Sequence, residues 1–419
     1  MPTTYILGAG ASHSYDVSPT GVLPPLSKGF FRAYCDLDIS GDVEVRVGDI
    51  VTYVRDEYGI PMGQFCTFNE DAEQFMTRLD RFVRDQAELI QSTSPEPEEF
   101  GVLVNRVRSH DQMIFLFAHV LNEIQNGPIS PDYEMLSSKA SDLDTFVTFN
   151  WDTLLDRALA SCTNWSPDTG YGVHFRAVLD GPWRSVERKR VANSPTYCKL
   201  HGSTNWLVNY MTWHLEKGER VMLTPRGQAP GHTTVASDMR FLESMLEGRL
   251  LEPEIRDVDW GSSAPPGADD PEGSPFLILR AHEPYRAYKN RYRAGYVPFA
   301  YFFPPNDPET DIPLMPLIVP PTEYKLYEEY AHIIDPLWDA ALESCSSSEQ
   351  VVILGYSFPV TDHRASMLMK EAFTRGCRKF VVANPHPDAV VDRLVDQAEI
   401  PRELIVSRPA TFREFVQGM

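Results

Sequence analysis

Short apolar runs alternate with longer amphipathic segments along most of this chain. The expected strands are Thr4–Leu7, Thr145–Phe149, Thr196–Leu200, Val351–Leu354, Lys379–Ala383 and Leu404–Val406. Apolar residues at three- to four-residue spacing predict the helices 70–90, 100–124, 153–159, 323–344, 362–374 and 411–416. Strands that are apolar throughout and alternate with helices are typical of a parallel sheet covered on both faces. We therefore predict an α/β fold with a Rossmann-like parallel sheet.

Two segments depart from this alternation. The long helical patterns between the first and second strands predict a helical layer within about residues 40–130. Residues 213–313 are rich in Pro, Gly, Asp and Glu, which predicts an irregular insertion with a short strand at 276–279. The remaining residues, 1–212 and 314–419, then form the Rossmann-like domain.

Composition limits the class of protein. A hydrophobic content of 42% over 419 residues supports a packed core, and 59 acidic against 38 basic residues give a net charge of −21. Such a charge disfavours nonspecific contact with nucleic acid. We expect no secretory signal at the N-terminus and no membrane span, because long apolar runs are missing from the sequence.

The six cysteines are dispersed, and none forms a C-x-x-C pair. This spacing argues against a structural zinc ribbon and against a disulfide framework. We expect no bound metal. We predict a cytoplasmic protein whose thiols are mostly buried.

The first strand runs directly into the turn Gly8-Ala9-Gly10-Ala11-Ser12. A strand entering Gly-x-Gly before a helix is how a doubly wound fold offers backbone N–H groups to a phosphate. Position 13 is histidine, so the complete G-x-G-x-x-G fingerprint is not met. The turn alone therefore indicates phosphate binding without identifying the nucleotide.

Polar residues also follow the other predicted strands. They are Asn150-Trp151-Asp152, His201-Gly202-Ser203, Gly355-Tyr356-Ser357 and Asn384. The carboxyl ends of parallel strands lie at one edge of a sheet, so we expect these groups to meet in one crevice.

His201 is the candidate base, because histidine titrates near neutral pH. The alternative is a ring that only caps a loop carbonyl. Asn150 can orient a ribose hydroxyl or a water molecule. Asn150 and Asp152 also precede a helix, where both residue types act as caps, and one helix start needs only one cap.

Other polar and aromatic residues have simpler explanations. Asp362 is well explained as the cap of the helix that follows it, and Asn384 together with Pro385 is equally explained as a turn. We interpret Trp151, Trp206 and Tyr356 as core residues.

Five short motifs, taken in order, resemble the sirtuin-like superfamily, and specifically its bacterial branch that cleaves NAD in antiphage defence. They are Gly8-Ala9-Gly10-Ala11-Ser12, Thr148-Phe149-Asn150-Trp151-Asp152, Lys199-Leu200-His201-Gly202-Ser203, Gly355-Tyr356-Ser357-Phe358 and Val382-Ala383-Asn384-Pro385. The resemblance implies that the first turn holds the pyrophosphate and that Asn150 and Asp152 lie around the nicotinamide and its ribose. It also implies that His201 is catalytic. Further nucleotide contacts would come from Gly202, Ser203, Gly355, Ser357 and Asn384.

The resemblance favours hydrolysis of NAD to nicotinamide and ADP-ribose. Protein-deacylating sirtuins carry a zinc module with paired cysteines, which this sequence lacks, so deacylation and ADP-ribosyl transfer are weaker alternatives. The resemblance further implies a gated enzyme that forms a homo-oligomer or works with a partner ATPase or nucleic-acid-sensing defence protein. An alternative of another class is a sensor or scaffold that binds NAD or ADP-ribose without cleaving it, although Asn150 and His201 argue against it.

Overall fold

The chain is represented by a computed structural model. It describes residues 2–37, 47–92, 97–179, 183–186, 193–209, 211–214, 219–225, 258–260, 274–278, 307–308, 314–322, 330–359 and 361–419. Within these stretches, no helix is both long and apolar enough to cross a membrane.

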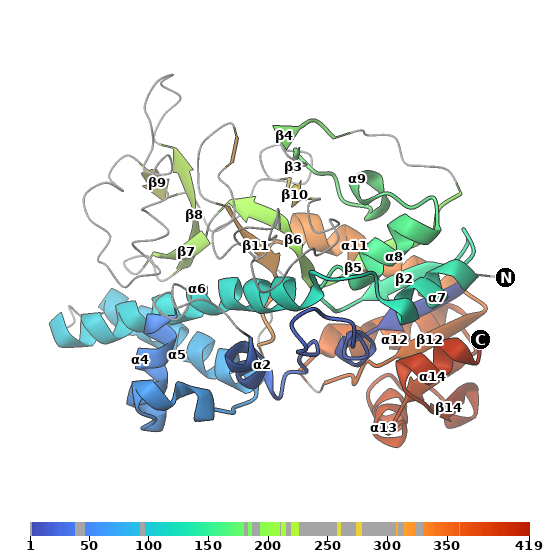
Figure 1. The fold of residues 1–419 in the computed structure, drawn as a ribbon, viewed down its shortest axis with the longest axis horizontal. Coiled ribbons are helices and arrows are strands. Elements are labelled where there is room, and N and C mark those ends of the chain that lie inside the picture. Colours follow the sequence, from blue (N-terminus) through green and yellow to red (C-terminus); the bar gives the residue numbers. More distant parts are fainter. Residues whose placement is uncertain are drawn as a thin grey trace.

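Six strands form the sheet that organises the fold (Figure 1). In spatial order they are β14 (Ile405–Pro409), β13 (Phe380–Asn384), β12 (Gln350–Leu354), β1 (Thr3–Leu7), β2 (Thr145–Thr148) and β5 (Thr196–Lys199). Every neighbouring pair is parallel. Numbered along the chain within this sheet, the order is 6-5-4-1-2-3, which is the order of dinucleotide-binding sheets. The predicted Rossmann-like parallel sheet is therefore confirmed.

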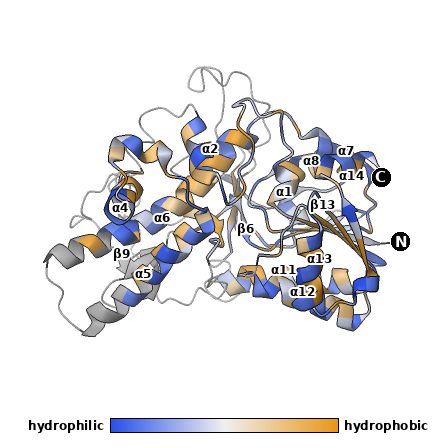
Figure 2. Ribbon diagram, turned by 90° about the horizontal axis from the view of Figure 1, so that it is seen from below, coloured by the Kyte–Doolittle hydropathy of each residue, from blue (hydrophilic) through white to orange (hydrophobic). Residues whose placement is uncertain are grey.

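Helices cover both faces of the sheet (Figure 2). On one face lie α7 (Pro131–Lys139), α8 (Leu154–Cys162) and α14 (Phe412–Gln417), and on the other lie α11 (Ala331–Ser347), α12 (His363–Arg375) and α13 (Asp388–Asp396). Central strand residues such as Ile6 and Ile353 are completely buried. Burial on both faces explains the runs of apolar residues in β12 and β13.

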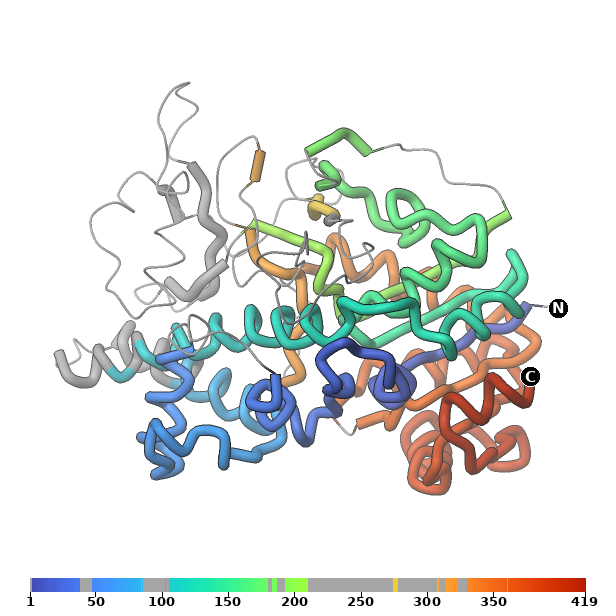
Figure 3. Tube along the Cα trace, in the orientation of Figure 1, coloured from blue at the N-terminus to red at the C-terminus, as the bar shows by residue number. Residues whose placement is uncertain are grey.

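A helical segment occupies the connection from β1 to β2 and lies beside the sheet (Figures 1 and 3). It contains α2 (Phe30–Asp36), α4 (Gly48–Tyr58), η1 (Met62–Thr67), α5 (Ala72–Ser92) and α6 (Pro97–Gln125). The two long helices predicted here correspond to α5 and α6. The short elements α1 (Ala9–Ser12) and α9 (Pro167–Gly170) follow β1 and α8, and η8 (Arg402–Leu404) precedes β14.

Aromatic packing and one disulfide hold the helical segment together. The ring of Phe31 lies 4.8 Å from that of Phe68 and 5.0 Å from that of Phe75. Nearby, Cys35 of α2 is bonded to Cys66 of η1, with the Cα atoms 5.7 Å apart. The prediction against disulfides was therefore wrong at this pair, because packing of α2 on η1 brings together two cysteines that are distant in sequence. Buried thiols, as predicted, are found at Cys198, Cys345 and Cys377.

A second sheet continues from the end of β5. Its order is β11 (Leu314–Ile318), β6 (Gly202–Asn209), β10 (Phe276–Ile278), β3 (Val178–Leu179) and β4 (Trp183–Arg184). Three further strands, β7 (Met211–His214), β8 (Glu219–Pro225) and β9 (Val258–Trp260), form a small sheet. The strand predicted at 276–279 corresponds to β10, and it pairs with β6. Most of the expected insertion lies outside the described residues.

Candidate functional site

The predicted strand ends lie along one edge of the six-stranded sheet. In the spatial order of the strands, the residues at this edge are Asn384, Gly355, Gly8, Asn150 and His201. The strand order reverses between β12 and β1, so Gly355 and Gly8 flank the point of reversal. In open α/β sheets this point is where ligands bind.

The two glycine turns at this point pack directly against each other. Gly8 N donates to Leu354 O at 3.0 Å, and Gly10 N donates to Gly355 O at 2.9 Å. Gly355 has a φ of +62°, and a Cβ atom there would lie 2.3 Å from the backbone nitrogen of Ala11. Glycine is therefore required for the close approach of the two turns. This approach uses the N–H groups of Gly8 and Gly10, which we expected to face a phosphate. Ala9 is the exposed residue of the first turn, and Ala11 is buried.

Aromatic rings meet above the end of β1. Phe149, which follows β2, stacks on Tyr356, which follows β12, with ring centroids 4.1 Å apart and planes inclined by 6°. A Cβ atom on Gly8 would lie 2.7 Å from the Tyr356 Cβ, so the glycine also makes room for this stack. Phe149 also contacts His201 edge-on, with the ring centroids 5.0 Å apart.

His201 faces a carboxylate. Its Nε2 atom lies 3.5 Å from Oδ2 of Asp362, and the Tyr356 hydroxyl donates to the same oxygen at 2.6 Å. His201 and Asp362 are only 6% and 2% exposed, so little solvent screens their interaction. This arrangement can hold the imidazole in one orientation at the edge of the sheet.

From its sequence context Asp362 is expected only to cap a helix, and the structure corrects this. Asp362 occupies the position before α12, but its side chain makes no capping hydrogen bond. Its neighbour Thr361 donates to the carboxylate of Glu73, in the first turn of α5. The turn that carries Asp362 therefore contacts both His201 and the helical segment.

Asn150 binds the first glycine turn. Its Nδ2 atom donates to Gly8 O and to Ser12 Oγ, both at 2.9 Å. A backbone carbonyl only accepts hydrogen bonds, so the contact with Gly8 fixes which end of the amide faces inward. Asn150 is thus not a helix cap, and its Oδ1 atom is left for other contacts.

Ser12 and Asp152 lie behind Asn150. Ser12 Oγ donates to Asp152 Oδ2 at 2.7 Å and contacts the Tyr133 hydroxyl at 3.0 Å. Asp152 Oδ1 accepts a hydrogen bond from Leu154 N at 3.1 Å, so Asp152 pairs with one of the backbone N–H groups at the start of α8. Burial raises the pKa of Asp152. The side chains of Ser12 and Asp152 are thus committed to interior contacts.

The other predicted nucleotide-binding residues also make internal contacts. Gly202 has a φ of +78° and packs against the Leu317 carbonyl. Ser203 Oγ lies 3.2 Å from Trp151 O and 2.5 Å from Asn205 Oδ1, and its single hydroxyl hydrogen can be donated to one of the two. Asn384 Oδ1 accepts from His386 N at 2.9 Å, which is the turn that the sequence also allowed. Ser357 is exposed, and its carbonyl accepts from Arg393.

Comparison with known proteins gives little beyond this geometry. No family model matches the chain, and no curated protein matches it. Among solved structures, the chain is similar to a histidine-to-asparagine mutant of a Sir2 homologue in complex with ADP-ribose. The TM-score is 0.38 and the identity 10%, over 99% of this chain and 89% of that one. Similarity at this level does not assign an activity, which must be argued from the site itself.

Proposed function

We propose that this chain is an NAD hydrolase that cleaves the bond between nicotinamide and ribose with water, giving nicotinamide and ADP-ribose. The observation that carries the proposal is the pair of His201 and Asp362, 3.5 Å apart at the carboxyl edge of the sheet. This pair lies beside the point where the strand order reverses, in a sheet with the dinucleotide-binding order. A histidine oriented by a carboxylate can act as a general base there.

Each residue of the edge has a role in this proposal. The exposed side of the Gly8–Ser12 turn receives the pyrophosphate. Asn150 presents Oδ1, an acceptor for a water molecule or a ribose hydroxyl, because its Nδ2 atom is committed to Gly8 and Ser12. His201 accepts the proton of the attacking water. We assign Asp152 to positioning rather than to binding the carboxamide, since both its oxygens accept interior hydrogen bonds.

The sequence resemblance supports a wider role. We propose that the enzyme is cytoplasmic and acts as a gated effector of antiphage defence, as a homo-oligomer or with a partner ATPase or nucleic-acid-sensing protein. Gating is expected because continuous loss of NAD would harm the host.

The test is NAD consumption by purified protein, with products resolved by chromatography. We expect His201→Ala to lose about 10²–10⁴-fold in turnover, while the exposed control His174→Ala retains wild-type turnover. Wild-type turnover in His201→Ala would contradict the proposal. Tight NAD binding without cleavage, also in the presence of candidate activators, would favour the sensor alternative.

A further inference from the structure

The turn between β2 and α8, which carries Asn150, is bound by Gln125, the last residue of α6. Gln125 is 3% exposed. Its Oε1 atom accepts from Thr153 N at 2.6 Å and from Thr153 Oγ1 at 3.1 Å. Its Nε2 atom donates to Thr204 Oγ1 at 3.3 Å and to Asn122 Oδ1 at 2.5 Å. The buried amide thus has partners for its oxygen and for both of its amide hydrogens.

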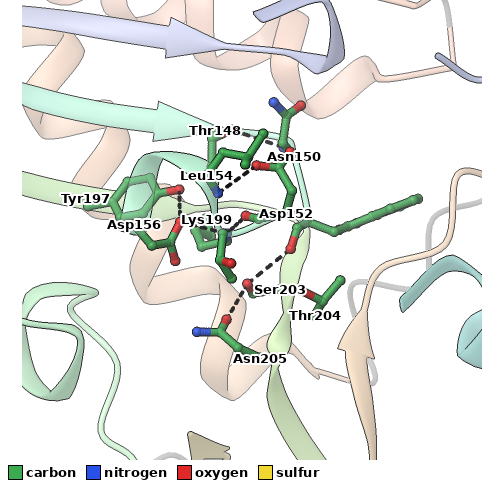
Figure 4. Close-up of polar contacts among 12 residues, drawn as sticks. Thr148, Asn150, Asp152, Leu154, Asp156, Tyr197, Lys199, Ser203, Thr204 and Asn205 are labelled. Atoms are coloured by element: carbon green, nitrogen blue, oxygen red, sulfur yellow. Dashed lines mark hydrogen bonds and ion pairs between the residues drawn. The ribbon is translucent and has the colours of Figure 1, made fainter. Parts of the chain in front are cut away.

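These contacts link the segments that carry the two candidate catalytic residues, Asn150 and His201. Thr153 ends the turn of Asn150, and Thr204 lies in β6, the strand that begins directly after His201. Figure 4 shows Asn150 and Thr204 in these two segments. The segments also meet directly, because Thr204 N donates to Trp151 O at 2.9 Å. A side chain that binds both segments can fix their relative position.

The end of α6 is itself fixed against α8. Arg157 of α8 is buried, and its guanidinium donates to Gln125 O at 2.6 Å and to Gly127 O. These carbonyl groups lie at and just after the C-terminus of α6, where carbonyls have no partner within the helix. Two turns earlier on α6, Phe117 packs on Trp151 with the ring centroids 5.1 Å apart. The last part of α6 therefore contacts the turn between β2 and α8 at two places.

We propose that Gln125 is a positioning residue for the proposed NAD cleavage. Its amide fixes the turn of Asn150 relative to His201, so that a water molecule or ribose hydroxyl bound by Asn150 meets the histidine. A displacement of reacting groups by about 1 Å can cost about 100-fold in rate. The inference rests on the proposed function for its catalytic consequence, whereas the contacts of Gln125 can be tested without NAD.

The same helix offers a matched control. Gln112 of α6 is also buried, its Nε2 atom donates to Asp49 Oδ2 at 2.7 Å, and its Oε1 atom accepts from Ile50 N at 3.3 Å. Gln112 thus binds the start of α4, as Gln125 binds the start of α8. Gln112→Met and Gln125→Met remove the same group from the same helix, but these contacts of Gln112 join α6 to α4 within the helical segment.

The first measurement is the kinetics of NAD cleavage by the two variants, at a temperature where circular dichroism shows both to be folded. We expect kcat of Gln125→Met to fall by roughly 10- to 100-fold. KM should change little, because the described contacts of Gln125 do not extend to the Gly8–Ser12 turn that is proposed to bind the pyrophosphate. Gln112→Met should retain wild-type kcat even if its Tm falls as far. Equal kcat values in the two variants would overturn the proposal.

Thr204→Val guards against misfolding of Gln125→Met, because it removes only the hydroxyl that accepts from Gln125 Nε2. We expect its kcat to fall by about 2- to 10-fold, as for the loss of one neutral hydrogen bond. Because the two residues share this bond, adding Thr204→Val to Gln125→Met should cost less than Thr204→Val costs in wild type. Wild-type kcat in Thr204→Val, or fully additive losses, would overturn the proposal.

A second readout, amide hydrogen exchange followed by mass spectrometry, does not depend on catalysis. Gln125→Met removes the acceptor of Thr153 N, so the peptide that contains Thr153 should exchange faster than in wild type. Gln112→Met should act instead on the peptide that contains Ile50. Unchanged exchange around Thr153 in Gln125→Met would overturn the proposal. If wild type does not cleave NAD, the proposed function fails, while the exchange comparison still decides whether Gln125 holds the turn.

Discussion

The Nε2 atom of His201 lies 3.5 Å from Oδ2 of Asp362, although the two residues follow different strands, β5 and β12. The Tyr356 hydroxyl donates to the same carboxylate oxygen, and the Tyr356 ring stacks on Phe149, which in turn meets His201 edge-on. These four side chains follow β5, β2 and β12, and they close a ring that passes over β1, which lies between β2 and β12. The orientation of the histidine thus depends on the whole edge of the sheet.

Asp362→Asn should impair catalysis while preserving the fold. It removes the charge that faces His201, and a hydrogen bond to a charged group is worth about 1.5–3 kcal/mol, or roughly 10- to 100-fold in kcat/KM. The measurement is kcat/KM for NAD cleavage by Asp362→Asn, compared with that of the exposed control Asp388→Asn. Equal activity in the two variants would show that the carboxylate has no part in the reaction.

Gly355→Ala should destabilise the protein strongly. The positive φ costs about 1–2 kcal/mol for an L-residue, and the added Cβ meets backbone at 2.3 Å. We expect a loss of more than about 2 kcal/mol in the free energy of unfolding, measured in urea. Gly63→Ala is the matched control, because a Cβ there meets nothing within 4 Å. If both variants are as stable as wild type, the described packing of the two turns is wrong.

Reduction of the Cys35–Cys66 disulfide should destabilise the helical segment. A sequence separation of 31 residues corresponds to about 3–4 kcal/mol of loop-closure entropy. Unfolding with and without reductant measures the effect, which should vanish in Cys35→Ser/Cys66→Ser and persist in the control Cys162→Ser. A response to reductant in the double variant would place its origin elsewhere.

Arg413→Ala should loosen the C-terminal helix. Arg413 contacts Asp16 at 2.8 Å and Asp132 at 3.1 Å, and it donates to Ser14 O at 3.0 Å. We expect a loss of about 1–2 kcal/mol, since Asp132 is buried and the contacts act together. Arg402→Ala breaks an exposed pair with Asp392 and should cost at most about 0.5 kcal/mol. Equal Tm values for the two variants would contradict this expectation.

Much of the fold could be predicted because its signals are local. The run Thr4–Leu7 is apolar and ends at Gly8, and the structure ends β1 at Leu7. The same holds for β12 and Gly355. Once these strands are parallel, their carboxyl ends must share an edge, so the positions of Asn150 and His201 relative to the glycine turns follow from topology.

The contacts of the site could not be predicted, because they join residues far apart in sequence. Asp362 has the local pattern of a helix cap, and only the fold brings His201 to it. Asp152 has the same local pattern, and its Oδ1 atom does accept a hydrogen bond from Leu154 N at the start of α8. Its Oδ2 atom, however, accepts a hydrogen bond from Ser12. Local sequence identifies the residue types that suit a cap, whereas long-range packing decides what each oxygen contacts.

The hydrogen bond from Thr361 to Glu73 joins the turn of Asp362 to the start of α5. A displacement of α5 that breaks this bond would remove one contact of the turn that carries Asp362. If such a displacement changes the affinity of the proposed nucleotide site, thermodynamic linkage requires the nucleotide to change the affinity for whatever displaces α5 by the same factor. The two binding measurements would then give the same coupling free energy.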